Sequence, residues 1–145
     1  MITIRRLQET DKTEWLRLRQ ALWSDHNVDD LKQEMKTIVA DDEQPIFVAE
    51  NSEGGLCGLL EVSIRSKAPG CTTNRIGYLE GWYVDRDWRK RGVGRRLVEE
   101  AETWARSIGC LEMASDTDSD YPVSPVAHAA LGYKTTEVYF RKALG

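Results

Sequence analysis

The sequence predicts an α/β domain built on one mixed sheet, with antiparallel strands first and parallel strands later. The chain has 145 residues, the usual size of one compact domain, so we expect a single domain over residues 1–145. Three apolar runs between residues 46 and 84 read as an antiparallel meander, and from residue 76 the patterns follow the order strand, helix, strand, helix, strand. That order implies a crossover between neighbouring parallel strands after an antiparallel beginning.

The first quarter of the chain predicts one strand and two helices. Residues 2–5 alternate like a strand. Thr10 and Asp11 offer a helix N-cap before apolar side chains at helical spacing, namely Trp15, Leu18 and Leu22. A second helix ends before Pro45, and its apolar positions repeat that spacing: Val28, Leu31, Met35, Ile38 and Val39.

The middle of the chain predicts an antiparallel meander. Residues 46–49 and 59–64 are apolar runs on either side of a glycine-containing turn, which is typical of a hairpin. The run at 76–84 follows a polar loop and adds a third strand.

The remaining elements alternate between helix and strand. A helix begins after Gly92 and ends at Gly109, with one apolar face formed by Val93, Leu97, Val98, Ala101, Trp104, Ala105 and Ile108. Residues 110–114 predict a short buried strand, residues 126–131 a short helix and residues 135–140 the last strand.

The overall charge narrows the possible partners. Lys and Arg number 20 against 24 Asp and Glu, which gives a formal net charge of −4. A general nucleic-acid binder needs a basic excess, so we expect no nucleic-acid partner and favour cationic ligands. The apolar runs are only a few residues long and the first residues lack a secretory-signal layout, so we expect neither a membrane span nor export.

Cysteine and histidine usage argues against a metal site. Cys57, Cys71 and Cys110 are odd in number, far apart and outside any C-x-x-C arrangement, which disfavours a disulfide framework or a zinc ribbon. The two histidines, His26 and His128, are more than a hundred positions apart. We expect no metal and a reducing, cytoplasmic location.

The strongest chemical signal is a glycine-containing loop between a strand and the long helix. Free backbone N–H groups at the helix start and about half a positive charge from the helix dipole favour an anion there. Gly92 and Gly94 allow close approach, and five basic side chains surround the turn: Arg89, Lys90, Arg91, Arg95 and Arg96. The sequence of this loop matches neither the Walker phosphate-binding motif nor the dinucleotide-binding fingerprint. The alternative is that the glycines serve only to begin the helix and that the basic side chains around them are merely solvated.

The pattern R-x-x-G-x-G at residues 89–94, after a strand ending Tyr83-Val84-Asp85, resembles the acetyl-coenzyme A pyrophosphate loop of the GNAT superfamily of N-acetyltransferases. The order of the elements agrees with that family over the whole chain. The resemblance implies the GNAT fold, a mixed central sheet with an antiparallel N-terminal meander and splayed parallel strands flanked by helices. It also implies acetyl-coenzyme A as co-substrate, held at Trp82, Tyr83, Val84, Arg89, Lys90, Arg91, Gly92, Val93, Gly94 and Arg95, with Tyr121 where the family has a contacting asparagine.

Three further segments resemble one subfamily, the aminoglycoside 6′-N-acetyltransferases that confer antibiotic resistance. They are Leu22-Trp23-Ser24-Asp25, residues 79–84 (LEGWYV) and residues 112–116 (EMASD). The resemblance implies that the aminoglycoside, or another polycationic amine, is bound by Trp23, Glu80, Asp116 and Glu137. It also implies a homodimer, to which the exposed-edge composition of the last strand adds support.

The residues themselves support an acidic site less specifically. Glu80 has the strand parity of Tyr78, Trp82 and Val84, so we expect a carboxylate among apolar neighbours that accepts a proton; an outward-facing Glu at a strand kink is the alternative. Asp116 follows a buried strand, at the end where ligands of parallel sheets collect.

Other candidates have competing structural interpretations. Asp118 and Asp120 fit a solvated acidic turn, because residues 121 and 127 break a calcium loop. From periodicity alone Trp23 belongs to the core, and only the resemblance places it in the site. His128 stands where many family members carry a tyrosine that protonates the departing thiolate, but it could equally be a structural group.

The resemblance implies direct transfer of an acetyl group from acetyl-coenzyme A to the 6′-amine of an aminoglycoside, and with the acidic residues it suggests Glu80 and Asp116 as catalytic residues. Two alternatives remain open. One is acetylation of a different amine, such as a polyamine or a protein amine. The other is a non-catalytic acyl-coenzyme A-binding module.

Overall fold

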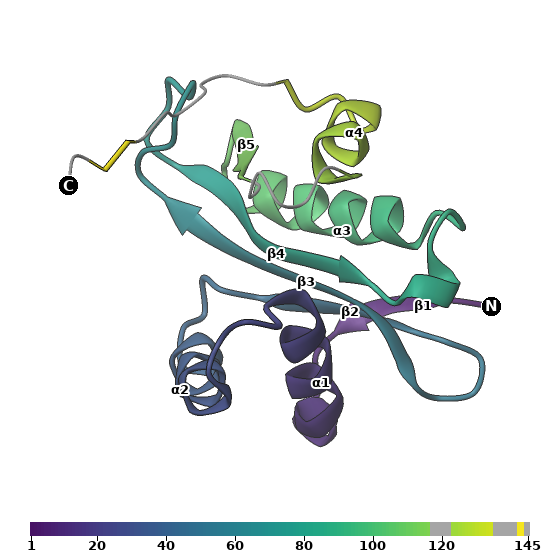
Figure 1. The fold of residues 1–145 in the computed structure, drawn as a ribbon. Helices are drawn as coiled ribbons and strands as arrows, with labels where there is room; N and C mark the ends of the chain where they lie inside the picture. Colours follow the sequence, from purple (N-terminus) through teal and green to yellow (C-terminus); the bar gives the residue numbers. More distant parts are fainter. Residues whose placement is uncertain (117–122, 135–141, 144–145) are drawn as a thin grey trace.

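Five strands form one mixed sheet in the computed structural model, which describes residues 1–116, 123–134 and 142–143 (Figure 1). The strands lie side by side in chain order: β1 (Thr3–Arg6), β2 (Ile46–Glu50), β3 (Leu56–Arg65), β4 (Ile76–Val84) and β5 (Glu112–Ser115). The first four are antiparallel neighbours, whereas β5 pairs with β4 in parallel. The predicted fold class is therefore confirmed.

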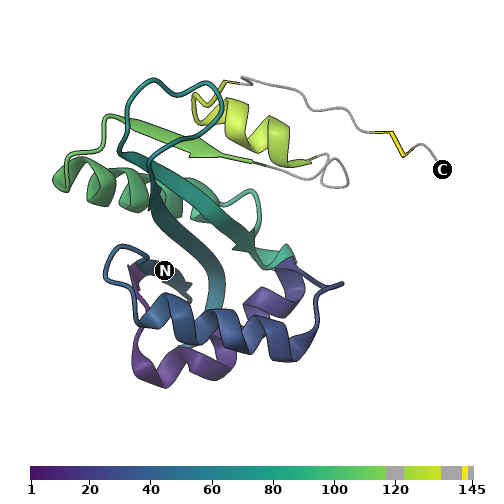
Figure 2. The same cartoon turned by 90° about the vertical axis from the view of Figure 1, so that its left-hand side faces the viewer.

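Helices cover both faces of the sheet (Figures 1 and 2). On one face lie the 3-10 turn η1 (Glu9–Asp11), α1 (Lys12–Leu22) and α2 (Val28–Val39). On the other face lie α3 (Val93–Ser107) and α4 (Val123–Ala130), and the short turn η2 (Arg86–Trp88) connects β4 to α3. Two apolar clusters fill the layers, one around Trp15 and Leu59 beneath α1 and α2, the other around Leu60 and Leu97 beneath α3.

Local chemistry explains where the helices begin and end. The Asn27 side chain accepts hydrogen bonds from the backbone N–H groups of Asp29 and Asp30, which caps the start of α2. Beyond α3, Gly109 has a φ of +91°, the left-handed conformation that a helix exit uses and that glycine adopts without strain.

Three elements differ from their predicted bounds by more than one residue, among them the strand predicted at 59–64, which is β3 at Leu56–Arg65. The predicted strand 110–114 is β5 at 112–115, because the backbone N–H of Cys110 donates to the Ala105 carbonyl and so belongs to the exit of α3. The predicted helix 126–131 is α4 at 123–130, since a first turn tolerates the proline in this segment. The predicted last strand, 135–140, lies outside the described residues. No helix in the described part of the chain has the length and apolarity needed to cross a bilayer.

Candidate active site

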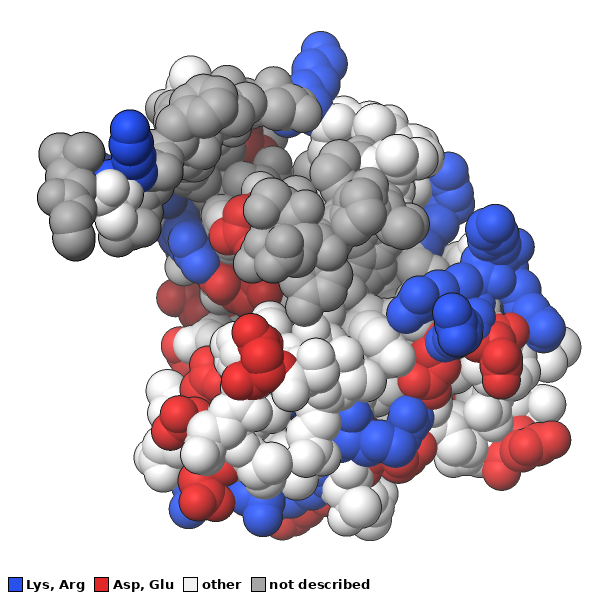
Figure 3. All heavy atoms as spheres, in the orientation of Figure 1, with Lys and Arg blue, Asp and Glu red and all other residues white. Residues whose placement is uncertain are grey.

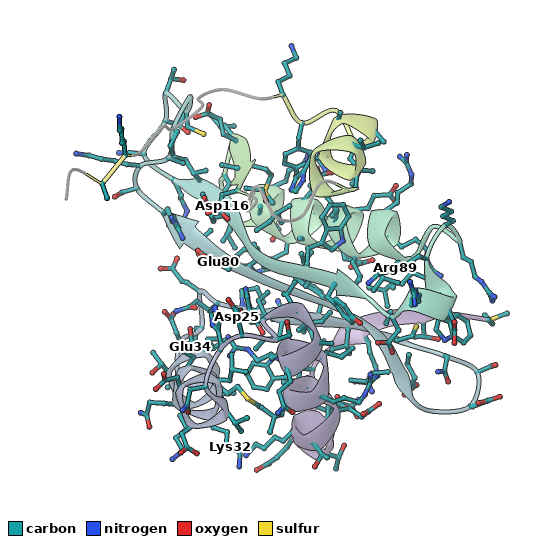
Figure 4. The ribbon with its side chains drawn as sticks, viewed as in Figure 1. Asp25, Lys32, Glu34, Glu80, Arg89 and Asp116 are labelled. Atoms are coloured by element: carbon teal, nitrogen blue, oxygen red, sulfur yellow. The ribbon has the colours of Figure 1, made fainter. Side chains whose placement is uncertain are left out.

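A cavity of about 300 Å³ opens between the first helical layer and the sheet, and two acids that line it, Glu34 and Glu80, are labelled in Figure 4. Side chains of α1, α2, β3 and β4 line it together with the residues after α1 and α2: Arg19, Trp23, Glu34, Thr37, Ile38, Gln44, Glu61, Val62 and Glu80. Three of these side chains are carboxylates. The cavity therefore offers a binding site for a cation.

A buried ion pair forms the floor of this cavity. Arg19 is 2% exposed and its guanidinium donates to both oxygens of Glu61, at 2.7 Å from Nε and 3.0 Å from Nη2. The Trp15 indole N–H donates to Glu61 as well, at 2.8 Å, and the Leu31 carbonyl accepts from Arg19 at 3.0 Å. Burial lowers the pKa of Arg19, but its hydrogen bond and ion pair with Glu61 outweigh that effect and raise the pKa above its ordinary value.

Sequence reasoning missed this pair, although the sequence contains a signal for it. Glu61 interrupts an apolar run that was assigned to a strand, and a charged residue inside a buried strand needs a partner. Nothing in the pattern identifies Arg19 as that partner, because its helix contains several other basic residues.

Trp23 lines the cavity and is only partly buried. It caps the C-terminal end of α1, the Arg19 guanidinium lies 4.8 Å from its ring centroid, and His26 stacks on it at 6.0 Å. Gly81 makes room for the indole, since a Cβ there would lie 2.7 Å from the Trp23 ring. The core position that periodicity favours for Trp23 is wrong, because α1 ends one residue earlier.

The predicted strand parity of Glu80 is wrong with respect to Trp82 and Val84, because β4 contains a β-bulge at this residue, whereas Tyr78 and Glu80 both contact Arg65. Glu61 pairs with Gly81 while Val62 pairs with Leu79, which leaves Glu80 as the extra residue. Trp82 therefore packs in the cluster beneath α3, whereas Glu80 lines the cavity on the opposite side of the sheet. The bulge separates the two side chains that the alternation had placed together.

Glu80 is also surrounded by polar groups and not by the expected apolar neighbours. The Ser63 hydroxyl donates to Oε2 at 2.5 Å, and Arg65 donates from Nε to Oε2 at 2.9 Å and from Nη2 to Oε1 at 2.7 Å. Both carboxylate oxygens thus have donors. In this state Glu80 already binds the Arg65 cation and the Ser63 hydroxyl.

Asp116 follows β5 and contacts β4 through Tyr78. The Tyr78 hydroxyl donates to Oδ2 of Asp116 at 2.6 Å. Burial, together with the hydrogen bond to Asp116 and its charge, raises the pKa of the Tyr78 phenol far above its ordinary value, so the hydroxyl stays a donor at neutral pH. The Arg65 guanidinium lies 3.6 Å from the centre of the Tyr78 ring. Glu80 and Asp116 are therefore connected through Arg65 and Tyr78.

The backbone of β4 has an open edge next to this acidic cluster. Its parallel pairing with β5 ends at Leu79 and Ser115, while its antiparallel pairing with β3 continues to Val84. Among the described residues, no strand pairs with Trp82, Tyr83 or Val84 on the β5 side. The predicted cofactor residues on β4 thus include backbone groups available to a ligand.

The glycine-containing loop leads from this edge into α3. Gly92 is the N-cap of α3 with a φ of +81°, and a Cβ there would meet nothing within 4 Å. Gly94 lies on the Trp82 indole, because a Cβ at this position would be 3.2 Å from the ring. The indole nitrogen of Trp82 is buried without a hydrogen-bond partner. The open space at Gly92 lies where the N–H groups of the helix start lack helical acceptors.

Basic side chains gather over η2 and the start of α3, at the right of Figure 3. Arg89, which is labelled in Figure 4, donates to the Val84 carbonyl at 2.8 Å and lies 5.6 Å from the Tyr83 ring centroid. Arg91 lies 5.0 Å from the Trp88 ring, and Arg95 contacts the Ala130 carbonyl at 3.5 Å. The predicted basic rim therefore exists, and several of its members hold the loop in place.

His128 approaches the open edge from α4. Its Nε2 lies 2.8 Å from the Ser115 hydroxyl, and its ring meets Trp82 edge-on with the centroids 5.2 Å apart. Sequence reasoning did not pair Ser115 with His128, because only the packing of α4 brings them together. A histidine hydrogen-bonded to a serine hydroxyl can pass a proton at this position.

Four predicted residues cannot be placed. Tyr121, Asp118, Asp120 and Glu137 lie outside the described residues.

Comparisons with known proteins agree with this architecture. A model of the Acetyltransferase (GNAT) family matches residues 5–133. An aminoglycoside N(6′)-acetyltransferase type 1 from Stenotrophomonas maltophilia is 39% identical over 98% of this chain and 94% of its own length. The Serratia marcescens protein of the same name is 38% identical over 90% of this chain and 92% of its own.

Two solved structures are similar over the full length. The aminoglycoside 6′-N-acetyltransferase AAC(6′)-Ih of Acinetobacter baumannii superimposes with a TM-score of 0.89 at 34% identity, covering 100% of both chains. AAC(6′)-Iy in complex with the bisubstrate analogue CoA-S-monomethyl-acetylneamine gives a TM-score of 0.89 at 33% identity, covering 99% of both. By its sequence and its fold, this chain belongs to the GNAT family of acetyltransferases.

Proposed function

We propose that this protein transfers the acetyl group of acetyl-coenzyme A to the 6′-amine of aminoglycoside antibiotics and so confers resistance to them. Relatives of that name, 34–39% identical over nearly the whole chain, support the activity, and so does a similar structure that holds a coenzyme A–aminoglycoside conjugate. One observation carries the assignment within this chain. The acidic cavity at Glu80 and the basic helix start at Gly92 lie along the same strand and its extension into α3.

The basic end of this arrangement fits acetyl-coenzyme A. The N–H groups at the start of α3 and the rim from Arg89 to Arg95 would bind the pyrophosphate, with Gly92 leaving space for it. Backbone groups of Trp82 to Val84 would hold the chain that carries the thioester, which supplies the acetyl group. Tyr121 is proposed as a further contact by resemblance alone.

The acidic end fits a polycationic aminoglycoside. Glu80 and Asp116 would bind ammonium groups, Trp23 would pack against the sugar ring, and Glu137 is proposed as an additional acid by resemblance. Each charge-assisted hydrogen bond to an ammonium contributes roughly 1.5–3 kcal/mol. Several such bonds together select polycations over single amines.

The reaction follows from these two positions. A neutral 6′-amine attacks the thioester carbonyl, a β4 backbone N–H stabilises the developing oxyanion, and the thiolate of coenzyme A leaves. Glu80, once free of Arg65, would accept the amine proton directly or through water. Holding both substrates in line lowers the activation barrier by about 7–11 kcal/mol, whereas a general base raises the rate roughly 10²–10⁴-fold. Positioning therefore contributes more to the rate than the base does.

We also propose that the protein is a homodimer and works in the reducing cytoplasm. The edge composition of residues 135–140 supports the dimer, and light scattering at the assay concentration tests it. The three free cysteines, two of them buried, support the location.

A panel of amines tests the activity. Purified protein is incubated with acetyl-coenzyme A and either kanamycin, tobramycin, spermidine or a peptide with a free α-amine, with thiol release and product mass as readouts. Acetylation of the aminoglycosides alone supports the proposal. Faster transfer to spermidine or the peptide would contradict it in favour of another amine substrate, and binding without turnover would indicate an acyl-coenzyme A-binding module.

A further inference from the structure

The position that the proposed function assigns to a substrate ammonium already holds a cation of the protein itself. Arg65 is the last residue of β3 and makes a two-pronged contact with Glu80, at 2.7 and 2.9 Å. The geometry is that of a guanidinium on a carboxylate, which an alkylammonium can replace.

The same guanidinium also lies between the two acids of the site. Its central carbon is 3.6 Å from the Tyr78 ring centroid, and the Tyr78 hydroxyl donates to Asp116. The hydrogen bond to Glu80, and the negative charges of Glu80 and Asp116, raise the pKa of Arg65 above its ordinary value. Arg65 therefore partly neutralises both carboxylates.

The contact is nevertheless open enough to be exchanged. The Arg65 side chain is 43% exposed and that of Glu80 is 30% exposed, so water reaches the ion pair. Pairs of this exposure add little to stability, and salt screens them. The buried pair of Arg19 and Glu61, at 2% and 4% exposure, has no such freedom.

We propose that Arg65 is an internal counter-ion that occupies the ammonium position at Glu80 in the free protein, and that an incoming substrate displaces it. This inference rests on the proposed function and concerns selectivity within that same site. Replacing one cation by another changes the local charge little, so an amine with a single ammonium gains almost nothing. A polycation gains further contacts, with Asp116 and with Glu34 on the cavity wall. Arg65 therefore lowers the affinity of every ammonium ligand at Glu80, and only a ligand with several ammonium groups has enough further contacts to bind tightly.

Calorimetric titration without acetyl-coenzyme A, at low salt, tests this. The probes are tobramycin and 6-amino-6-deoxyglucose, which has one amine. Arg65→Gln should tighten the binding of both by about two- to fivefold, the range for exposed ion pairs, and KM for tobramycin should fall. Arg65→Lys keeps the positive charge but loses the two-pronged contact, so its affinity for both probes should lie between those of the wild type and Arg65→Gln.

Arg75→Gln is the matched control. Arg75 is 42% exposed, pairs with Glu43 at 3.0 Å and does not line the cavity, so this variant changes the net charge equally. Affinity that falls or stays constant in Arg65→Gln, or that rises equally in Arg75→Gln, would overturn the inference. Tighter binding without any acetyl transfer would instead overturn the proposed function, and wild-type protein that binds no tobramycin would overturn both.

Discussion

Adding the same carboxylate at either end of α3 separates cofactor binding from helix stability. Gly92 and Gly109 flank the helix with φ values of +81° and +91°, and a Cβ at either position would meet nothing within 4 Å. Gly92→Asp and Gly109→Asp therefore carry a similar backbone cost, about 1 kcal/mol, without a clash. The helix dipole distinguishes them. It stabilises a negative charge at the N-terminus and destabilises one at the C-terminus, by roughly 0.3–1 kcal/mol each.

Consequently, Gly109→Asp should lose more stability than Gly92→Asp, whereas Gly92→Asp should lose more affinity for coenzyme A. Gly109→Asp should be the less stable variant, by about 0.6–2 kcal/mol, measured by thermal or urea unfolding. Gly92→Asp should lose coenzyme A affinity by about tenfold to a hundredfold, which corresponds to one charge-assisted hydrogen bond, while Gly109→Asp should bind normally in calorimetry. Equal affinity in the two folded variants would refute the assignment of the helix start as the phosphate site.

Three further outcomes are expected. Glu80→Gln should lower kcat/KM for tobramycin by roughly 10²–10⁴-fold and Asp116→Asn should chiefly raise KM, both with unchanged coenzyme A affinity; wild-type kcat/KM in both variants at neutral pH would contradict the acidic-site mechanism. Glu61→Gln should lower the free energy of unfolding in urea by about 3–5 kcal/mol, because it leaves the buried Arg19 charge without its ion-pair partner Glu61. A decrease below about 1 kcal/mol would contradict that role. The hydrogen bond from Arg5 holds the pKa of Asp11 below its ordinary value, so the ionised Asp11 stabilises the fold above about pH 4 and this stabilisation is lost as the pH falls. The free energy of unfolding of Asp11→Asn should therefore depend less on pH in acid, and an unchanged pH profile would contradict this.

The order of the elements could be predicted from the sequence because each apolar pattern has one dominant period. The face of α3 repeats at helical spacing over fifteen residues, and its glycine exit is local chemistry that needs no tertiary information. The loop at Gly92 was predictable for the same reason. The anion-binding role proposed for it depends on backbone N–H groups, which follow from the strand, glycine and helix order alone.

The acidic site was predicted only in part, since its geometry depends on contacts that are distant in the sequence. Strand alternation assumes an unbroken ladder, and the bulge opposite Glu61 and Val62 moved Glu80 to the other face from Trp82. Arg65 and Ser63 contact Glu80 from the neighbouring strand β3, and no local pattern on β4 indicates them. Pairings between strands and between layers cannot be read from periodicity.

Transfer to neomycin and to paromomycin, which differ only in carrying an amine or a hydroxyl at 6′, tests the central claim most directly. Each is mixed with the protein and acetyl-coenzyme A, and product mass with NMR assignment locates the acetyl group. The account predicts rapid acetylation of neomycin at the 6′-nitrogen and no transfer to paromomycin. Acetylation of paromomycin at a comparable rate, or of neomycin at another nitrogen, would contradict it.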